Sequence, residues 1–407
     1  MKAEPVVPVG PRSGRFTVYV CILLLVVATA LLGGCSGSES GQPASAAAPP
    51  AEPSGAAPSS ADPTAQTQSA PAQPAPEGGL PRVAGPFTHA NLSFYLLTGE
   101  HQPEHDHLLT LQEAMERKLV KVHETGKVSE LAVENLSPTR SIFIQAGDIV
   151  RGGKQDRTLG VDMIVAANSG RVPIASFCVE RGRWSQRGGE NLQQFSSAMN
   201  SLPGKNLKAA ARYNKNQDKV WANVAKTQAS LSEKVSGRVI ADDSVSSMEL
   251  TMESAALKEK TAKFEQAFDD LLAQHPKATG VVVAINGEIS SADVYLSPVL
   301  FGKLWPKLSH AAYTEALAEA PATGAGNFKW PAAAEVRAWL LQTREPVAKI
   351  TTVNATTSEA VRKGGTFLRF DSRDANLTGQ TVRMNAIRLT KEEMAELEAA
   401  TPPTPGR

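Results

Sequence analysis

The sequence predicts an α+β fold of mixed, mostly antiparallel strands with several helices, and two observations carry that prediction. Strand-like runs come first in the globular part, helical patterns follow, and strands return near the C-terminus. This order differs from the regular strand–helix alternation that builds parallel sheets. In addition, the turns Asn-Ser-Gly at 168–170 and Asn-Gly at 286–287 each separate two apolar runs, as hairpin turns do.

The first half of the globular part is predicted to contain strands and one short helix. Thr110 and Glu113 have the spacing of a capping box, so a helix should open here and run to about residue 119. The runs 161–167 and 172–180 should pair as a hairpin. Four further alternating or apolar runs predict strands, at 91–97, 120–124, 131–135 and 141–144.

Helices dominate the next part of the chain, and strands close it. The apolar runs 280–286 and 292–296, joined through Asn286 and Gly287, predict a second hairpin. Strands are expected at 366–370 and 380–389. Residues with helical patterns predict helices at 217–231, 253–274, 298–308, 311–318 and 391–399.

The N-terminus predicts a lipoprotein signal peptide over residues 1–34. Three basic residues precede an apolar run at 16–32, and two glycines and Cys35 follow. A basic start and an apolar core are typical of secretory signals, and small residues before a cysteine have the form of a lipobox. Cleavage would leave Cys35 as a lipidated N-terminus. The alternative is an uncleaved transmembrane helix, for which this run is at the lower limit of about 17 to 25 residues.

Residues 35–82 are predicted to be the lipidated cysteine and a disordered linker, because Ala, Pro, Ser, Gly, Gln and Glu bury too little apolar surface to fold. The globular domain should cover 83–397, as one body or two lobes, and 398–407 should be a disordered tail. Ser36 follows the cysteine, where Asp would indicate inner-membrane retention. The predicted location is therefore the cell envelope, at the periplasmic face of the outer membrane in a Gram-negative source.

Charge and cysteine content restrict the partners. The 42 basic and 41 acidic residues leave a net charge of +1, so no general field attracts nucleic acid. Cys178 is the single cysteine of the globular part, which excludes an internal disulfide. A lone thiol in an oxidising compartment is expected to be buried. The predicted partners are the membrane, through Cys35, and a small anionic ligand; no protein partner is specified.

Two polar clusters within 147–184 form the candidate ligand site. The first reads Gly-Gly-Lys-Gln-Asp-Arg and the second Glu-Arg-Gly-Arg-Trp. Lys154 and Arg157 offer charge to an anion beside glycine-rich backbone, Arg183 offers a planar fork for phosphate or carboxylate, and Trp184 offers a stacking face. The alternative is a turn whose charges are paired or solvated, with Trp184 against the core.

The first cluster does not match a P-loop, because Asp148 occupies the position of the first glycine and Gln155 follows the lysine. Alternation along 172–180 places Cys178 and Glu180 on one face of a strand. Glu180 or Asp148 would act as general acid or base if the domain is an enzyme. Cys178 would need a base or cation to act as a nucleophile, and none is identified nearby.

Other polar residues are interpreted as structural. His101, His105 and His107 are interleaved with acidic residues, and a His-X-His segment can bind zinc or copper. No Cys–His set elsewhere completes a tetrahedral site, so a solvated loop is preferred and no metal is predicted. Asp371 and Asp374 are interpreted as turn residues.

Several segments resemble the family named for its association with ADP-ribosylglycohydrolases and rhodanese-phosphatases. The Gly-Gly-Lys-Gln and Glu-Arg-Gly-Arg-Trp pieces are the specific elements, and the resemblance covers about 91–389. It implies an uncharacterised α+β domain, suspected by gene association of a role near NAD or ADP-ribose metabolism. The segments that carry it are 109–114, 147–148, 152–157, 178–184, 284–287 and 304–308.

These observations together predict a membrane-anchored bacterial lipoprotein whose domain binds a small anionic or nucleotide-like ligand. The alternative is a non-catalytic envelope lipoprotein with a structural or protein-interaction role. The residues name neither a reaction nor a cofactor.

Overall fold

The structure is a computed structural model that describes residues 79–399 except 191, 194, 323–325 and 346–347. The predicted signal peptide, Cys35, most of the linker and the end of the tail lie outside the described residues. All described residues belong to one unit, Ala70–Arg407. The fold is α+β, as predicted, and among its described strand pairs only β3 with β6 is parallel.

The largest sheet has eight antiparallel strands. Asn286 and Gly287 connect two of its central strands and have positive φ angles of 54° and 85°, which confirms the predicted hairpin. In spatial order, the strands are β1 (Arg82–His89), β2 (Leu92–Thr98), β12 (Gly280–Ile285), β13 (Glu288–Tyr295), β17 (Gln380–Arg388), β16 (Phe367–Asp374), β15 (Thr357–Lys363) and β14 (Lys349–Asn354).

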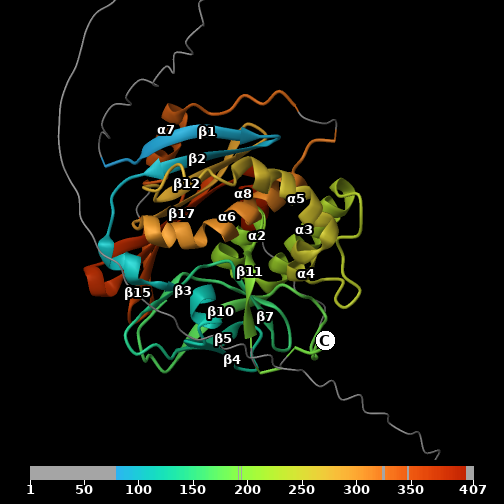
Figure 1. Cartoon of the computed structure of the whole chain (residues 1–407), viewed down its shortest axis with the longest axis vertical. Coiled ribbons are helices and arrows are strands. Elements are labelled where there is room, and N and C mark those ends of the chain that lie inside the picture. The colour runs from blue at the N-terminus through green and yellow to red at the C-terminus, as the bar shows by residue number, and fades with distance from the viewer. Residues whose placement is uncertain (1–78, 191, 194, 323–325, 346–347, 400–407) are drawn as a thin grey trace, which may run out of the picture. The chain divides into compact units, whose positions relative to one another are not determined.

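Helices cover both faces of this sheet, and side-chain alternation explains how (Figure 1). In β2, Leu92, Phe94 and Leu96 pack in a core with α5 (Ala255–Phe268) and α6 (Pro298–Ala318). Tyr95 and Leu97 point the other way, into a core with α7 (Ala333–Gln342). Since both faces of the central strands are apolar, α5 and α6 bury one face and α7 buries the other.

The remaining strands form two smaller sheets that share a core. The six-stranded sheet contains, in order, β11 (Phe195–Ser201), β7 (Asp148–Gly152), β8 (Arg157–Leu159), β10 (Arg171–Cys178), β5 (Glu130–Asn135) and β4 (Val120–Glu124). The three-stranded sheet contains β3 (Leu109–Thr110), β6 (Ile142–Ile144) and β9 (Met163–Val165).

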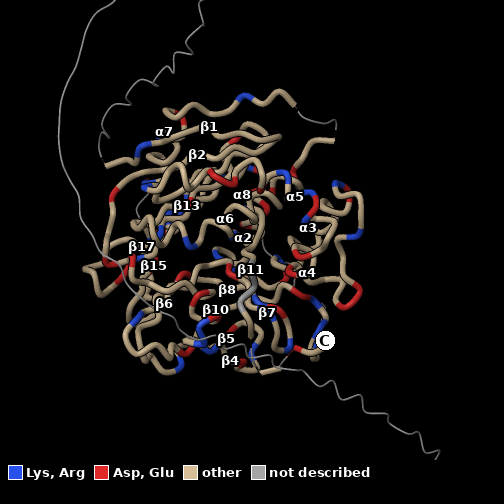
Figure 2. Tube along the Cα trace, viewed as in Figure 1, with Lys and Arg blue, Asp and Glu red and all other residues tan. Residues whose placement is uncertain are grey.

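The remaining helices and turns connect the strands. Thr110 and Glu113 form the predicted capping box at the start of α1 (Leu111–Glu116). The other helices are α2 (Lys205–Ala209), the π-helix η2 (Ala210–Asn214), α3 (Gln217–Lys234), α4 (Met248–Glu253), α8 (Lys391–Glu398) and the 3₁₀ turns η1 (Pro103–His107) and η3 (Ala375–Leu377). None of the described helices is long and apolar enough to cross a membrane. Figure 2 shows basic and acidic positions intermixed along the described chain.

Several predictions about single elements are wrong. β9 and β10 do not form the hairpin expected from 161–167 and 172–180, because β9 pairs with β6 while β10 pairs with β8 and β5. The helix expected at 253–274 is shorter than predicted: α5 starts at Ala255, after Ser254 caps it with its hydroxyl, and ends at Phe268. The helices expected at 298–308 and 311–318 are one helix, α6.

The prediction that Asp371 is a turn residue is also wrong. Asp371 is a buried residue of strand β16, and its carboxylate accepts hydrogen bonds from Arg369. Asp374 does serve a turn, since its carboxylate accepts from the backbone N–H of Asn376. The short helix α1 ends at Glu116, before the predicted residue 119.

Candidate functional site

The residues predicted to bind a ligand lie together beside β7 and β8. Lys154 is in the turn between these strands, and its ammonium lies 4.8 Å from the centroid of the Trp184 ring. The guanidinium of Arg157 lies 5.7 Å from the same ring. Trp184 is 46% exposed, whereas Arg157 is fully buried and donates to the Val128 carbonyl. The folded chain therefore brings the predicted residues together, although their geometry alone does not assign a ligand to them.

Glu180 and Arg183 belong to a buried ionic network. The Arg183 guanidinium lies 2.7 Å from Glu180 Oε2, and that of Arg187 lies 2.9 Å from Oε1. Burial is the largest influence and opposes ionisation of Glu180, but the hydrogen bonds from Arg183, Ser244 and the Asp156 backbone, with the Arg183 charge, together outweigh it, so the pKa of the carboxyl is lowered. Glu180 is thus held as an ionised carboxylate paired with arginine, which agrees with the structural alternative for this cluster. Its catalytic role stays a prediction.

The same network reaches the next element of the fold. Arg187 also binds Asp156 at 3.0 Å and Glu190 at 2.8 Å. Glu190 in turn binds Arg151, whose other partner is Glu253 of α4, at 2.7 Å. We call the seven residues the arginine–carboxylate network: Arg151, Asp156, Glu180, Arg183, Arg187, Glu190 and Glu253. It connects the two predicted clusters to α4.

The catalytic candidate Asp148 and the lone cysteine, Cys178, are both buried. Asp148 lies 3.4 Å from the ammonium of Lys307 on α6 and is 1% exposed. Cys178 is fully buried, as expected for a lone thiol, and burial raises the pKa of its thiol. Its Sγ donates to the Glu180 carbonyl. A protonated, enclosed thiol is a poor nucleophile.

The three histidines of the η1 region do not converge. His101 pairs with Asp106 at 2.9 Å, and His105 is buried 3.8 Å from Asp374. His107 is exposed. Within the described part of the chain, no group of three or more His, Cys, Asp or Glu side chains is arranged to hold a metal ion.

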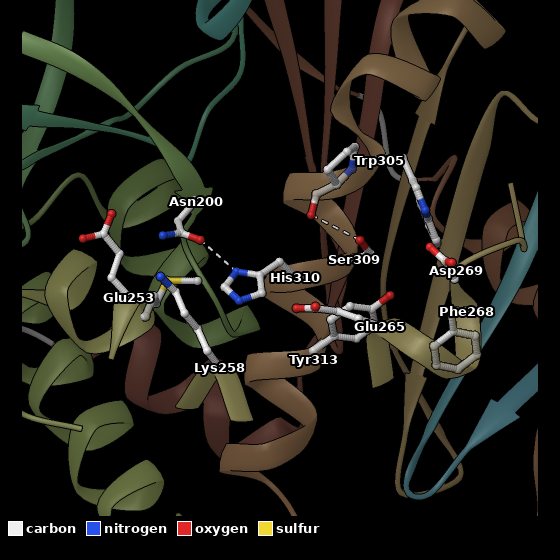
Figure 3. Close-up of a pocket in the computed structure, with 12 residues that line it drawn as sticks. Asn200, Glu253, Lys258, Glu265, Phe268, Asp269, Trp305, Ser309, His310 and Tyr313 are labelled. Carbon is white, nitrogen blue, oxygen red and sulfur yellow. Dashed lines mark hydrogen bonds between the residues drawn. The ribbon is translucent and has the colours of Figure 1, made fainter. Parts of the chain in front are cut away.

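A pocket of about 680 Å³ opens where α4, α5, α6 and β11 meet (Figure 3). This volume is within the range of about 300 to 1,000 Å³ that is usual for small-molecule sites. Glu253 connects the pocket wall directly to the arginine–carboxylate network. The pocket is lined by Asn200, Met252, Glu253, Lys258, Glu265, Phe268, Asp269, Trp305, Pro306, Ser309, His310 and Tyr313.

One end of the pocket is aromatic and acidic. Figure 3 places Trp305, Phe268 and Asp269 at this end, with Glu265 and Tyr313 in the middle. Phe268 and Tyr313 stack with ring centroids 6.1 Å apart. Burial, with the nearby charges of Glu265 and Asp269, raises the pKa of Tyr313 to about 12. The charges of Glu265 and Asp269 therefore indicate a negative potential beside an aromatic surface.

The opposite end carries a hydrogen-bonded chain of three side chains. His310 on α6 contacts Asn200 on β11, with 2.8 Å between Nδ1 and Oδ1. Asn200 donates from Nδ2 to Oε1 of Glu249 on α4, at 2.9 Å. Burial lowers the pKa of His310 and raises that of Glu249 to about 8. Lys258 lines the pocket near this end.

Sequence reasoning did not identify this pocket. One signal was present, because Lys258, Glu265 and Asp269 recur at intervals of seven and four residues and so share one face of α5. Polar residues on one face of an amphipathic helix ordinarily face solvent. Only the packing of α5 against α6 shows that this face borders a cavity.

The fold and the pocket define an α+β domain with a small-molecule-sized cleft between α5 and α6. The chain belongs to the family of the ARG and Rhodanese-Phosphatase-superfamily-associated Protein domain, ARPP-1, whose model matches residues 81–390. The family resemblance drawn from the two polar clusters is thereby confirmed. No curated protein and no solved structure matches the chain. What this membership establishes is a domain of unknown function.

Proposed function

We propose that the domain binds a small molecule with an apolar or aromatic body and a cationic group in the pocket between α5 and α6. The observation that carries the proposal is the pairing of Trp305, Phe268 and Tyr313 with the carboxylates of Glu265 and Asp269 around one cavity. A cation over an aromatic face gains about 0.5 to 2 kcal/mol. Carboxylates at the mouth add attraction for the same charge.

The charge balance of the pocket supports a cation over an anion. Glu253 is neutralised by Arg151 at 2.7 Å, and Lys258 offsets one further carboxylate. Glu265 and Asp269 together carry one more negative charge than Lys258 supplies. Both acidic side chains are exposed at the rim, so they are available to an incoming ligand.

Three ligands that share one aromatic ring test the proposal. The full chain in detergent micelles would be titrated calorimetrically with benzylamine, benzyl alcohol and benzoate, and benzylamine should bind tightest. The double variant Glu265→Gln, Asp269→Asn should weaken benzylamine binding about 2- to 30-fold, because each rim carboxylate contributes modestly, and leave benzyl alcohol unchanged. The double variant Glu259→Gln, Asp270→Asn removes the same number of charges from exposed positions outside the pocket lining and serves as the control. Equal affinity for benzoate and benzylamine would refute the proposal.

An anionic, nucleotide-like ligand at the two polar clusters remains a second candidate. The placement of the Lys154 ammonium over the half-exposed Trp184 ring supports it. Arg183 supports it less, since two carboxylates already bind its guanidinium. A rise in melting temperature with ADP-ribose, NAD or phosphate that disappears in Lys154→Ala would favour this site. No rise with any of the three would remove it.

We further propose that Cys35 carries the lipid that anchors the chain in the cell envelope. The basic, apolar and small-residue order before Cys35 supports the proposal. Metabolic labelling with an alkyne fatty acid should modify the wild-type chain and spare Cys35→Ser. The non-catalytic alternative, a structural or protein-interaction lipoprotein, is favoured if the anchor is labelled and neither ligand panel binds.

A further inference from the structure

The geometry points to His310 as the general base of a hydrolytic reaction in the pocket. This inference rests on the proposed function, because the same cavity must first hold the substrate. The ligand class is an ester or amide whose acyl carbon lies at the His310 end while its apolar body occupies the aromatic end. Asn200 and Glu249 are positioning residues, since they act through the imidazole.

The hydrogen-bonded chain sets the tautomer of His310. Asn200 donates from Nδ2 to Glu249, so its other amide atom, the acceptor Oδ1, is the one that faces His310. An acceptor at 2.8 Å requires that Nδ1 of the neutral imidazole carries the proton. Nε2 then holds a lone pair. Figure 3 shows the ring between Asn200 and the pocket side chains of Lys258 and Glu265.

Glu249 holds the amide in this orientation. It is fully buried on α4, and Oε1 is the atom that accepts from Asn200. Its Oε2 has no hydrogen-bond partner among the described residues. When the neutral acid carries its proton on Oε2, Oε1 still accepts from Asn200, so the same orientation of Asn200 is compatible with both charge states of Glu249.

Charged groups from two elements, α5 and α4, lie around His310. Lys258 and Glu265 face it from α5, with opposite signs. Glu249 lies behind Asn200 on α4, and Glu253 on the same helix is neutralised by Arg151. Burial is the largest influence on the ring and favours its neutral form, which is the form that accepts a proton.

The reaction needs only water as co-reactant. Nε2 removes a proton from a water molecule as the water oxygen forms a bond to the acyl carbon. The bond from that carbon to the leaving oxygen or nitrogen then breaks. The protonated imidazole returns its proton to the leaving group, which restores the base.

The test uses 4-nitrophenyl acetate as the probe and the full chain in detergent micelles. The wild type should hydrolyse the probe with saturation, and His310→Gln should lower kcat at least about 100-fold. His275→Gln changes a half-buried histidine outside the pocket lining and should leave the rate unchanged. Asn200→Ala should lower kcat more than it changes KM. In histidine-selective ¹⁵N spectra, that variant should also lose the preference of His310 for the Nδ1-protonated tautomer.

Benzylamine titration of the same samples separates the two proposals. If His310→Gln still binds benzylamine and its kcat falls, the general-base assignment is supported. Wild-type rates in His310→Gln, an absence of saturable hydrolysis in the wild type, or an Nε2-protonated ring would each overturn the assignment while the binding proposal stands. If the wild type does not bind benzylamine, the proposed function is refuted instead.

Discussion

Replacing Asp162 with Asn should strongly destabilise the fold, because this buried carboxylate joins the eight-stranded sheet to the smaller sheets. It lies 2.7 Å from the guanidinium of Arg212 and 2.7 Å from that of Arg383. It also accepts from the Ser372 hydroxyl and the Ala146 backbone N–H. Asn retains the size of the side chain but removes its charge and one of its acceptor oxygens.

The magnitude follows from the pKa and from the partners left behind. Although burial opposes ionisation, the two arginines lower the pKa of Asp162 from 3.8 to about 2, which corresponds to about 2 kcal/mol. Removing one member of a buried ion pair costs about 3 to 5 kcal/mol. In the variant, Arg212 is still paired with Glu359 and Arg383 with Asp293, so the loss of stability should be smaller than for an arginine without another partner. We therefore expect Asp162→Asn to lower the free energy of unfolding by about 2 to 5 kcal/mol.

Urea denaturation followed by circular dichroism measures this loss. Since the folded pKa is the lower one, the contribution of Asp162 is present above pH 3.8 and is lost as the pH falls through about 2. The control is Asp242→Asn, which breaks an exposed pair with Arg238 and should change stability by less than about 1 kcal/mol. An equally small change for Asp162→Asn would refute the reasoning.

Three further predictions concern other buried groups. Burial raises the folded pKa of Glu249 from 4.5 to about 8, so the wild type loses stability as the pH rises from 4.5 through 8. In urea titrations, the free energy of unfolding of Glu249→Gln should therefore rise by about 2 to 5 kcal/mol relative to that of the wild type between pH 4.5 and 9. A difference that does not change with pH would contradict this. Cys178 should react with iodoacetamide at pH 7.5 only after unfolding, as mass spectrometry would detect. Gly153→Ala should cost more stability than Gly188→Ala: both glycines have similar positive φ angles, but a Cβ at 153 would lie 2.4 Å from the Phe195 ring, whereas one at 188 would meet nothing within 4 Å. Equal melting temperatures for the two variants would disprove the clash.

Local signals in the sequence predicted local structure well. The capping box at Thr110 and the Asn286–Gly287 turn depend on residues at most three positions apart, so their chemistry is visible in the sequence. The turn at 168–170 was misleading because the strands that flank it find other partners: β6 for β9, and β5 and β8 for β10. Strand pairing is decided by distant residues.

The candidate site could be predicted only in part for the same reason. Lys154, Arg157 and Trp184 do come together, as the two clusters indicated. The sequence could not show that Arg183 also pairs with Asp156, because these residues are 27 positions apart and meet only when the chain folds. The pocket was invisible for a stronger reason. Its polar residues Asn200 and His310 are 110 positions apart and meet only in the folded chain.

The most direct test of the account is whether a cationic aromatic ligand enters the pocket beside Trp305. The full chain would be labelled with 5-fluorotryptophan and titrated with benzylamine, with the Trp305 signal assigned from Trp305→Phe. We expect a saturable ¹⁹F shift at Trp305 and none at Trp339 of α7, which packs on the opposite face of the eight-stranded sheet. Benzoate should leave both signals in place. An unchanged Trp305 signal at saturating benzylamine would contradict the proposed binding site.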